Sequence, residues 1–505
     1  MKNIFTISLL FFITLVCKGQ SLFDDLNTDN INEEEIIAEV GNIKITAEEF
    51  FYGYEFGPAF VKRIPDSKET YLKYLINEKL MALEGYEQEI FNNSETSGVL
   101  DEFKSDLATE EMFKDEILSK VRISESEIDT VLNSKLIELE IKWLYSSDQS
   151  GIGNYLNSLK SGANFDSLFL SQINDSVYLD MRMMNVTAFD LLKKNRLLYK
   201  IVDTLKAGDV SAPIHTDDGW YIVKLNNISK NMITSETEHT KLKLESEQAV
   251  KKYKMDLLSD LYVDSLMRNE KLVIKRDAFN ILRSYLGKFI LPDDKYDGWD
   301  LENKLETALN NLGLSREDEY PGIDLVTGAN SNYKIEEFIV WFRNRENYLK
   351  FNKVDLINFS RSLENYVWRM VRDRLLTSAA GVKGYFENEW VVRQSNWWKE
   401  KIAYSAMKNK LTESVILENK EINFSGENNE TQKEKLSAEL TEKIFRKITE
   451  LKKKFPVNIN EKILNQVNVS QINDKKAIEF YAVKNSGLIP RPAFPSIDHD
   501  WGNWQ

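Results

Sequence analysis

Residues Ile201 to Asn226, IVDTLKAGDVSAPIHTDDGWYIVKLN, carry the signals that decide the fold of the central part of the chain. A short amphipathic helix comes first and ends at a turn that contains Gly208. Pro213 then opens an extended run, and a second turn at Gly219 leads into the apolar strand Trp220–Leu225. This order of helix, glycine turn, edge strand, glycine turn and closing strand predicts the end of a small α/β domain.

The same alternation extends back along the chain, so residues 138–228 form one predicted α/β unit. Strands are predicted at 139–145 and 177–186, and helices at 153–160 and 188–205. The surrounding chain differs, because apolar residues recur there at helical spacing over long stretches. We therefore expect a mainly helical α+β protein with one inserted α/β domain.

Length and composition set the wider frame. A chain of 505 residues predicts two to four domains at about 100–200 residues each. The net charge of −14 is spread along the chain and argues against nucleic acid as a partner, because phosphate binding needs a basic surface. The predicted segments are a signal peptide (1–19), a flexible acidic leader (20–35), a helical module (36–137), the α/β domain (138–230), a long return helix (231–280), a linker (281–321), a second helical module (322–420), a second return helix (421–470) and a C-terminal tail (471–505).

The first residues are typical of an export signal. Lys2 gives a positive start, and an apolar run of about 13 residues, Ile4–Val16, precedes a small-residue cleavage site before Gln20. The run is too short to span a membrane, which needs about 20 residues, and no other stretch is long and apolar enough. Cys17 allows a lipoprotein alternative, but Val16 is bulkier than a lipid-attachment signal prefers, so we favour plain cleavage.

Cysteine and histidine content excludes several kinds of site. Cys17 is the only cysteine, so the mature chain is expected to have neither a disulfide nor a thiolate nucleophile. The three histidines, His215, His239 and His499, are far apart in sequence, which argues against a zinc site or a Ser-His-Asp triad. No phosphate loop or dinucleotide fingerprint is present either. We expect no cofactor and no metal.

Two parts of the chain are similar to each other. Residues 325–338, LVTGANSNYKIEEF, parallel residues 36–50, IIAEVGNIKITAEEF, and VRDRLL at 371–376 parallels INEKLM at 76–81. A long amphipathic helix follows each copy, and we assign 231–280 to the first. The pattern predicts a duplicated helical module whose second copy lacks the inserted domain.

The tail is the last feature of note. From Ile489 it reads IPRPAFPSIDHDWGNWQ, with three prolines and the rings of Phe494, Trp501 and Trp504. Such a segment is typical of an extended peptide that docks on a partner, and a disordered end is the alternative. We name these three rings as candidates for partner docking.

Residues 138–228 resemble a parvulin domain of the PpiC type, a family of peptidyl-prolyl cis–trans isomerases. Leu159–Phe165 is similar to the family's L-x-x-G-A-x-F, Leu205–Pro213 to L-x-x-G-E-V-S-x-P, and Thr216 with Gly219–Leu225 to its closing strand T-x-x-G-Y-H-I-I-K-V. The flanking helices resemble the chaperone module of SurA-type periplasmic folding factors. The resemblance implies a periplasmic location and a role in protein folding.

The departures from the family concern its active site. The resemblance aligns Lys142 with the histidine of S-H-I-L, Tyr221 with the closing-strand histidine, and Leu198 with a pocket phenylalanine, while Asp180–Asn185 lacks the central G-G-D-L-G. A lysine has only donors and a tyrosine has a different reach from an imidazole, so we expect weak or absent isomerase activity. The candidates for peptide binding are Lys142, Trp143, Phe165, Leu198 and Tyr221, and the alternative is that they are ordinary sheet residues.

Three functions remain open on the sequence. The first is a chaperone or assembly factor that binds unfolded or partly folded envelope proteins, including outer-membrane proteins. The second is an active isomerase that uses Lys142 or Tyr221 in place of the imidazoles. The third is a structural subunit of an outer-membrane assembly or secretion complex.

Overall fold

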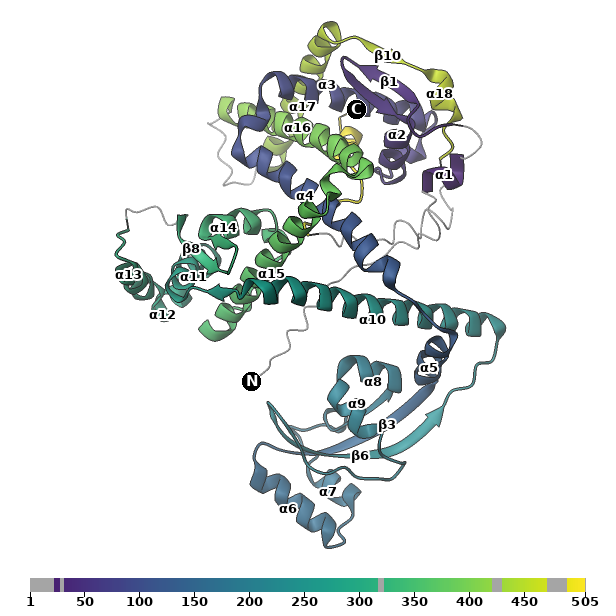
Figure 1. Ribbon diagram of the computed structural model, residues 1–505, viewed down its shortest axis with the longest axis vertical. Coiled ribbons are helices and arrows are strands. Elements are labelled where there is room, and N and C mark those ends of the chain that lie inside the picture. The colour runs from purple at the N-terminus through teal and green to yellow at the C-terminus, as the bar shows by residue number, and fades with distance from the viewer. Residues whose placement is uncertain (1–21, 28–30, 317–321, 420–428, 470–487, 505) are drawn as a thin grey trace. The chain divides into compact units, whose positions relative to one another are not determined.

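The computed structural model describes residues 22–27, 31–316, 322–419, 429–469 and 488–504. It divides the chain into two compact units, Leu118–Leu258 and the remainder, Met1–Ile117 with Ser259–Gln505. Helices predominate, and the described strands form three small antiparallel sheets (Figure 1). The mainly helical α+β class expected from the sequence is therefore confirmed.

The central unit, 118–258, is built on a four-stranded sheet of order β4-β3-β6-β5. Helices α6 and α7 cover one face of this sheet and α8 and α9 cover the other (Figure 1). Its elements are α5(Glu125–Leu136), β3(Ile137–Ser146), α6(Gln149–Lys160), α7(Phe165–Ser171), β4(Met183–Thr187), α8(Ala188–Lys194), α9(Arg196–Val202), β5(Ile214–Thr216), β6(Gly219–Lys230) and the start of α10(Glu236–Glu270).

Strand alternation gives this sheet two cores. Leu139, Ile141 and Val223 are buried on the side of α8 and α9, whereas Leu144 and Ile222 are buried on the side of α6 and α7. Successive side chains of a strand point to opposite faces, so both faces of the two central strands are apolar. The two central strands can be buried on both sides for this reason.

The second unit contains two three-stranded sheets, and we call the elements around them the first and the second module. The first module has a sheet of order β10-β1-β2, and the second has one of order β7-β8-β9. The first module comprises β1(Ile36–Val40), β2(Ile43–Thr46), α2(Ala47–Glu55), α3(Ser67–Glu87), α4(Ser94–Glu116), α16(Glu389–Glu418), α17(Asn429–Lys454), β10(Val457–Ile459) and α18(Glu461–Gln466). The second comprises β7(Val273–Ile274), α11(Arg276–Ile290), α12(Asp293–Gly298), α13(Leu301–Leu312), β8(Asp324–Thr327), β9(Asn332–Lys334), α14(Ile335–Arg343) and α15(Leu356–Val382).

The third strand of each sheet follows a long helix, and the sequence did not predict these two strands. β10, which follows α17, pairs with β1 and places Val457 opposite Val40 (Figure 1). β7, which follows α10, pairs with β8 and places Val273 opposite Thr327. The long helix at 231–280 thus leads into the second module, and the one at 421–470 leads back to the first. An amphipathic pattern specifies a helix but not the hairpin with which the next strand pairs.

Two segments expected to be irregular are folded. Leu22–Asn27 forms helix α1, and the ring of Phe23 lies 5.4 Å from that of Phe51, edge to face. The expected linker at 281–321 contributes α11, α12 and α13, with Ile281 and Leu282 fully buried. In both segments apolar side chains recur at helical spacing and pack into a core. The polar overall composition of these segments does not reveal this spacing.

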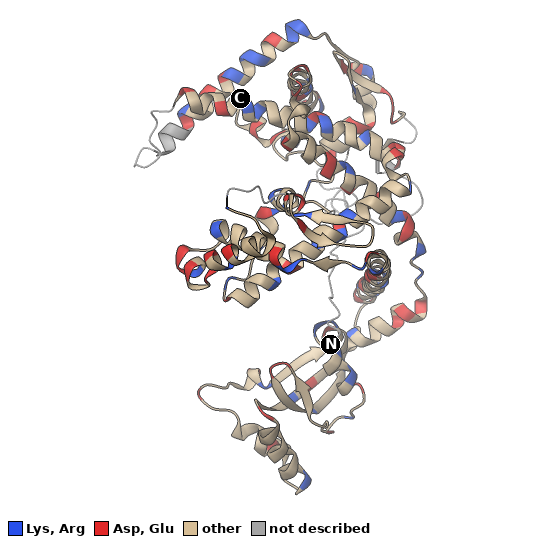
Figure 2. Ribbon diagram, turned by 60° about the vertical axis from the view of Figure 1, so that its left-hand side comes forward, with Lys and Arg blue, Asp and Glu red and all other residues tan. Residues whose placement is uncertain are grey.

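Charged residues of both signs alternate along the helices, as Figure 2 shows. Among the helices that the structure describes, none combines the length and the apolar character required to cross a membrane.

Candidate functional site

The sheet register separates the residues that the sequence placed in one peptide site. Lys142 of β3 lies opposite Lys224 of β6, whereas Tyr221 lies opposite Tyr145. Because side chains alternate along a strand, Lys142 and Tyr221 point to opposite faces of the sheet. Of the five candidates, Trp143, Leu198 and Tyr221 border the core under α8 and α9, and Phe165 lies in the other core.

Two tyrosine rings lie together on the face that α8 and α9 cover. The rings of Tyr145 and Tyr221 are 5.2 Å apart at 59°. Tyr221 Oη donates a 2.5 Å hydrogen bond to the Asp218 carboxylate, and Tyr145 Oη donates one of 2.7 Å to the Asp218 carbonyl. The Arg182 guanidinium lies 4.8 Å from the centre of the Tyr145 ring. We call Tyr145, Arg182, Asp218 and Tyr221 the tyrosine site.

The turn between β5 and β6 positions this site. Gly219 has φ +143°, and a Cβ there would lie 2.7 Å from the Ser146 carbonyl oxygen and 2.7 Å from the Tyr145 ring. A glycine is therefore required for the turn to approach β3 this closely. Thr216 Oγ1 donates a 2.5 Å hydrogen bond to the Asp218 carboxylate and holds it beneath Tyr221.

The electrostatics of the site favour hydrogen bonding over proton transfer. Burial and the hydrogen bond to Asp218 raise the pKa of Tyr221 to about 12. Hydrogen bonds from Thr216 and Tyr221 lower the pKa of Asp218 below its usual value. At neutral pH the phenol is thus neutral and the carboxylate is charged. The site presents aromatic faces, and the shifted pKa values of Tyr221 and Asp218 do not suit general acid–base work between these two groups.

Lys142 and Phe165 belong to an ion cluster on the other face. Asp166 accepts from Lys142 at 3.2 Å and from Lys224 at 2.6 Å. The two ammonium groups lie over aromatic rings, Lys142 at 5.6 Å from Phe169 and Lys224 at 5.5 Å from Phe165. The hydrogen bond from Lys224 is the main cause of a lowered Asp166 pKa. The cluster fastens α7 to the sheet, which is a structural role.

The sequence did not identify the other members of the tyrosine site or the surface near β4. Strand alternation counted from Trp143 would have found Tyr145. Next to β4 a hollow of about 540 Å³ is lined by Tyr178, Leu179, Met183 and Met184, among others. Tyr178 and Leu179 are exposed despite their apolar side chains. This surface occupies the segment in which the family carries its glycine-rich loop.

Histidine takes no part in the tyrosine site. His215 is the one histidine of this sheet in the described residues, and its ring lies 4.6 Å from Trp220, its cross-strand partner. Trp220 and Tyr221 are successive strand residues, so the His215 imidazole points away from Tyr221. In the same described ranges no group of His, Cys, Asp or Glu side chains is arranged to hold a metal ion.

The three tail rings are buried within the chain itself. Phe494 stacks on Tyr52 with 4.2 Å between ring centres, and Trp501 stacks on Tyr74 at 5.2 Å. Trp504 lies edge to face with Trp501. At most 7% of each of the three residues is exposed, so the surface we expected to dock on another protein is seated in the first module instead.

No family model matches the chain, and no curated protein matches it. Similar solved structures are chains of the peptidyl-prolyl isomerase or foldase PrsA, at low identity and partial coverage. The PrsA of Bacillus anthracis is 12% identical, with 42% of this chain and 73% of that chain covered and a TM-score of 0.20. The PrsA of Bacillus cereus is 14% identical, with 56% and 99% covered and a TM-score of 0.20. The foldase PrsA of Streptococcus pneumoniae is 12% identical, with 55% and 93% covered and a TM-score of 0.21.

Proposed function

We propose that the protein is a parvulin-type folding factor that binds unfolded or partly folded exported proteins and has little or no isomerase activity. The observation that carries the proposal is the tyrosine site, where the Tyr221 phenol stands at a position that the resemblance gives to an imidazole, beside the Tyr145 ring and the Arg182 guanidinium. The faces of the two rings suit the binding of an extended peptide. The exposed Tyr178 and Leu179 next to β4 add apolar contact area for the same ligand.

Weak catalysis follows from the chemistry of these groups. Rotation about a prolyl peptide bond has a barrier of about 18–20 kcal/mol, and an enzyme must stabilise the twisted amide more than the planar one. Tyr221 already donates its proton to Asp218, so it has none to offer a twisted amide. Binding that is equal for both forms of the amide gives no acceleration.

The proposal assigns this activity to the periplasm on the basis of the predicted export signal, with unfolded outer-membrane proteins as the expected clients. The signal lies outside the described residues, so its support is the sequence alone.

Two assays test the proposal together. The mature protein is added to a chemically unfolded outer-membrane barrel on dilution, and light scattering reports aggregation. A proline-containing tetrapeptide reports isomerisation with and without the protein. We expect suppressed aggregation and an isomerisation rate close to the uncatalysed one. Unchanged aggregation would contradict the chaperone, and turnover typical of active parvulins would contradict the loss of catalysis.

An active isomerase is the second candidate, because one donor of the tyrosine site is unused. Arg182 Nε is buried and has no hydrogen-bond partner, and its guanidinium lies over Tyr145. A substrate carbonyl could accept from it. The tetrapeptide assay decides between the two candidates. A structural subunit of an envelope complex was the third possibility, and its main support, a free aromatic tail, is weakened by the burial of that tail.

A further inference from the structure

One pair of positions that the repeat makes equivalent differs sharply in side-chain size between the two modules. Aligning the shared Glu-Glu-Phe places Gly53 of α2 opposite Trp341 of α14. Aligning the long helices in the same way places Glu78 of α3 opposite Asp373 of α15. The first pair changes a glycine for the largest side chain, while the second keeps a buried carboxylate.

In both modules the carboxylate accepts from an indole, but the indole has a different source. In the second module Trp341 Nε1 donates to Asp373 at 2.9 Å from the neighbouring helix. In the first module the helix has only Gly53, and Trp501 of the tail donates to Glu78 at 2.9 Å. The tail thus supplies the indole donor in the first module, and α14 supplies it in the second.

Gly53 creates the space through which the tail runs. A Cβ at this position would lie 2.5 Å from Tyr71 Oη and 3.3 Å from the Pro495 carbonyl oxygen. A larger side chain would occupy the path of the tail. Without residues 493–504, which pack in the core of the first module, that module would therefore have an open groove between α2, α3 and α16, with the buried carboxylate of Glu78 at its floor.

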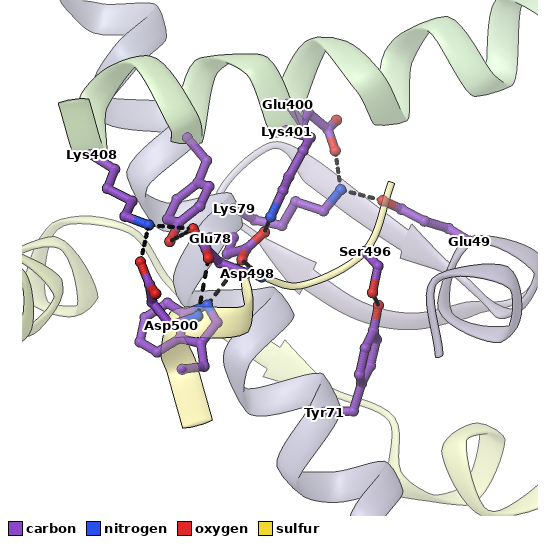
Figure 3. A network of polar contacts seen from close by, with 12 residues as sticks. Glu49, Tyr71, Glu78, Lys79, Glu400, Lys401, Lys408, Ser496, Asp498 and Asp500 are labelled. Atoms are coloured by element: carbon purple, nitrogen blue, oxygen red, sulfur yellow. Dashed lines mark hydrogen bonds and ion pairs between the residues drawn. The ribbon is translucent and has the colours of Figure 1, made fainter. Parts of the chain in front are cut away.

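Polar contacts hold the tail as they would hold a bound peptide (Figure 3). The Asp498 backbone N–H donates to Glu78 Oε1 at 2.6 Å. Lys408 of α16 donates to the carboxylates of Asp498 at 2.7 Å and Asp500 at 2.5 Å. The acids of the tail meet a lysine of the groove, and the indole of the tail meets an acid of the groove. These charged contacts distinguish the groove from a purely apolar core.

Lys401 completes the floor of the groove. Its ammonium group pairs with Glu78 at 2.7 Å, so the Glu78 carboxylate keeps its charge compensated when the tail is absent. Lys408 lies 5.1 Å from the Trp504 ring and contributes a cation–π contact to the end of the tail. Three elements of the tail thus contact the groove: an indole donor, two carboxylates that precede it and a second aromatic ring that follows it.

We propose that the first module is a peptide-binding site, that residues 493–504 occupy it in cis, and that it accepts client segments of the same chemistry when they displace the tail. The ligand class is an extended segment in which acidic residues precede a tryptophan, as Asp498 and Asp500 precede Trp501. The part concerning clients rests on the folding-factor function proposed above. The tail then acts as an internal competitor that keeps the groove covered until a client is present.

The test loosens the tail in the full-length chain and offers a second copy of it. Asp498→Asn with Asp500→Asn removes both ion pairs to Lys408 and leaves the apolar anchors in place. The probe is a fluorescein-labelled synthetic peptide of residues 488–504, and anisotropy reports its binding. We expect the double variant to bind the probe at least about tenfold more tightly than the parent chain, whose own tail covers the groove. A probe with Trp501→Phe lacks the indole donor to a charged acceptor and should bind about tenfold more weakly.

Two results overturn the inference. One is a folded double variant that binds the probe no better than the parent chain. The other is equal binding of the native and the Trp501→Phe probes. Circular dichroism and thermal melting establish that the variant is folded. Asp500→Asn alone is a milder variant, because the Asp500 side chain is 44% exposed and its substitution removes only one ion pair to Lys408. We expect this variant also to bind the probe more tightly than the parent chain does.

The barrel aggregation assay separates this inference from the proposed function. Probe binding without any suppression of aggregation would retain the groove and refute the folding factor. Suppression by both chains without probe binding would retain the folding factor and refute the groove.

Discussion

Replacing Lys79 by methionine tests the buried charge network under the tail. Lys79 of α3 lies between the carboxylates of Glu49 and Glu400 (Figure 3), and its side chain is 4% exposed. Burial alone would lower the pKa of Lys79, but the two carboxylates raise it above its ordinary value, so the lysine is charged. The substitution leaves two carboxylates without their cation, and the side chain of one of them, Glu49, is only 6% exposed.

The expected loss is about 3–5 kcal/mol in the free energy of unfolding, the range for breaking a buried ion pair from one side. Burial also raises the pKa of Glu49, and the loss of Lys79 removes a group that lowers it. Glu49 of the variant can therefore take up a proton as the pH falls, which relieves the uncompensated charge. The loss should be largest at pH 8 and smaller at pH 5.5.

Urea denaturation at the two pH values, followed by tryptophan fluorescence, measures the loss in the free energy of unfolding. The matched control is Lys79→Met combined with Glu49→Gln, which removes one of the two stranded charges and should recover about half of the loss at pH 8. A loss below about 1 kcal/mol at pH 8, or one that grows on acidification, would refute the reasoning.

Two further predictions concern other ionisable and site residues. Burial is the main cause that raises the pKa of Glu48 to about 7, against the opposing charge of Arg393, so the native state binds this proton more tightly than the unfolded state. Stability should fall as the pH rises from about 4.5 to 7, and Glu48→Gln should be up to about 3 kcal/mol more stable than the parent at pH 8 and equal to it near pH 4, measured by urea denaturation; equal stability at both pH values would contradict this. Lys142→His with Tyr221→His should give no gain in isomerisation of a proline peptide, because the two positions face opposite sides of the sheet. Tyr145→His with Tyr221→His is the control that places two imidazoles on one face, and a gain confined to the first pair would show that the face assignment is wrong.

The sequence predicts local structure well, but it does not predict which strands from distant parts of the chain pair. The hairpin at 36–46 and its copy at 324–334 were predictable, because turn residues and alternation act over a few positions. The pairing of β10 with β1 was not, since nothing local in Val457–Ile459 distinguishes one hairpin from the other.

The candidate site shows the same limit. The family motif located β3 and β6 correctly, but the faces of Lys142 and Trp143 depend on a register that only the paired strands define. A register shift adds to the difficulty, because Glu140 pairs with Asn227 and Ile141 with Leu225, so Asn226 is an extra residue that breaks simple alternation along β6. The tail rings were recognised as docking groups, yet their seat depends on Gly53, whose significance is visible only next to Trp341.

The pairing of β10 with β1 also bears on the order in which the modules form during synthesis. The second module draws its elements from one continuous span, 273–382, so it can close as soon as that span has emerged. The hairpin at 36–46 must wait for Val457–Ile459, and α3 must wait for α16. Contacts between such distant residues form slowly, because a long loop has to close first. The earliest residues of the fold are thus among the last to be buried, and they are exposed to aggregation and proteolysis in the interval.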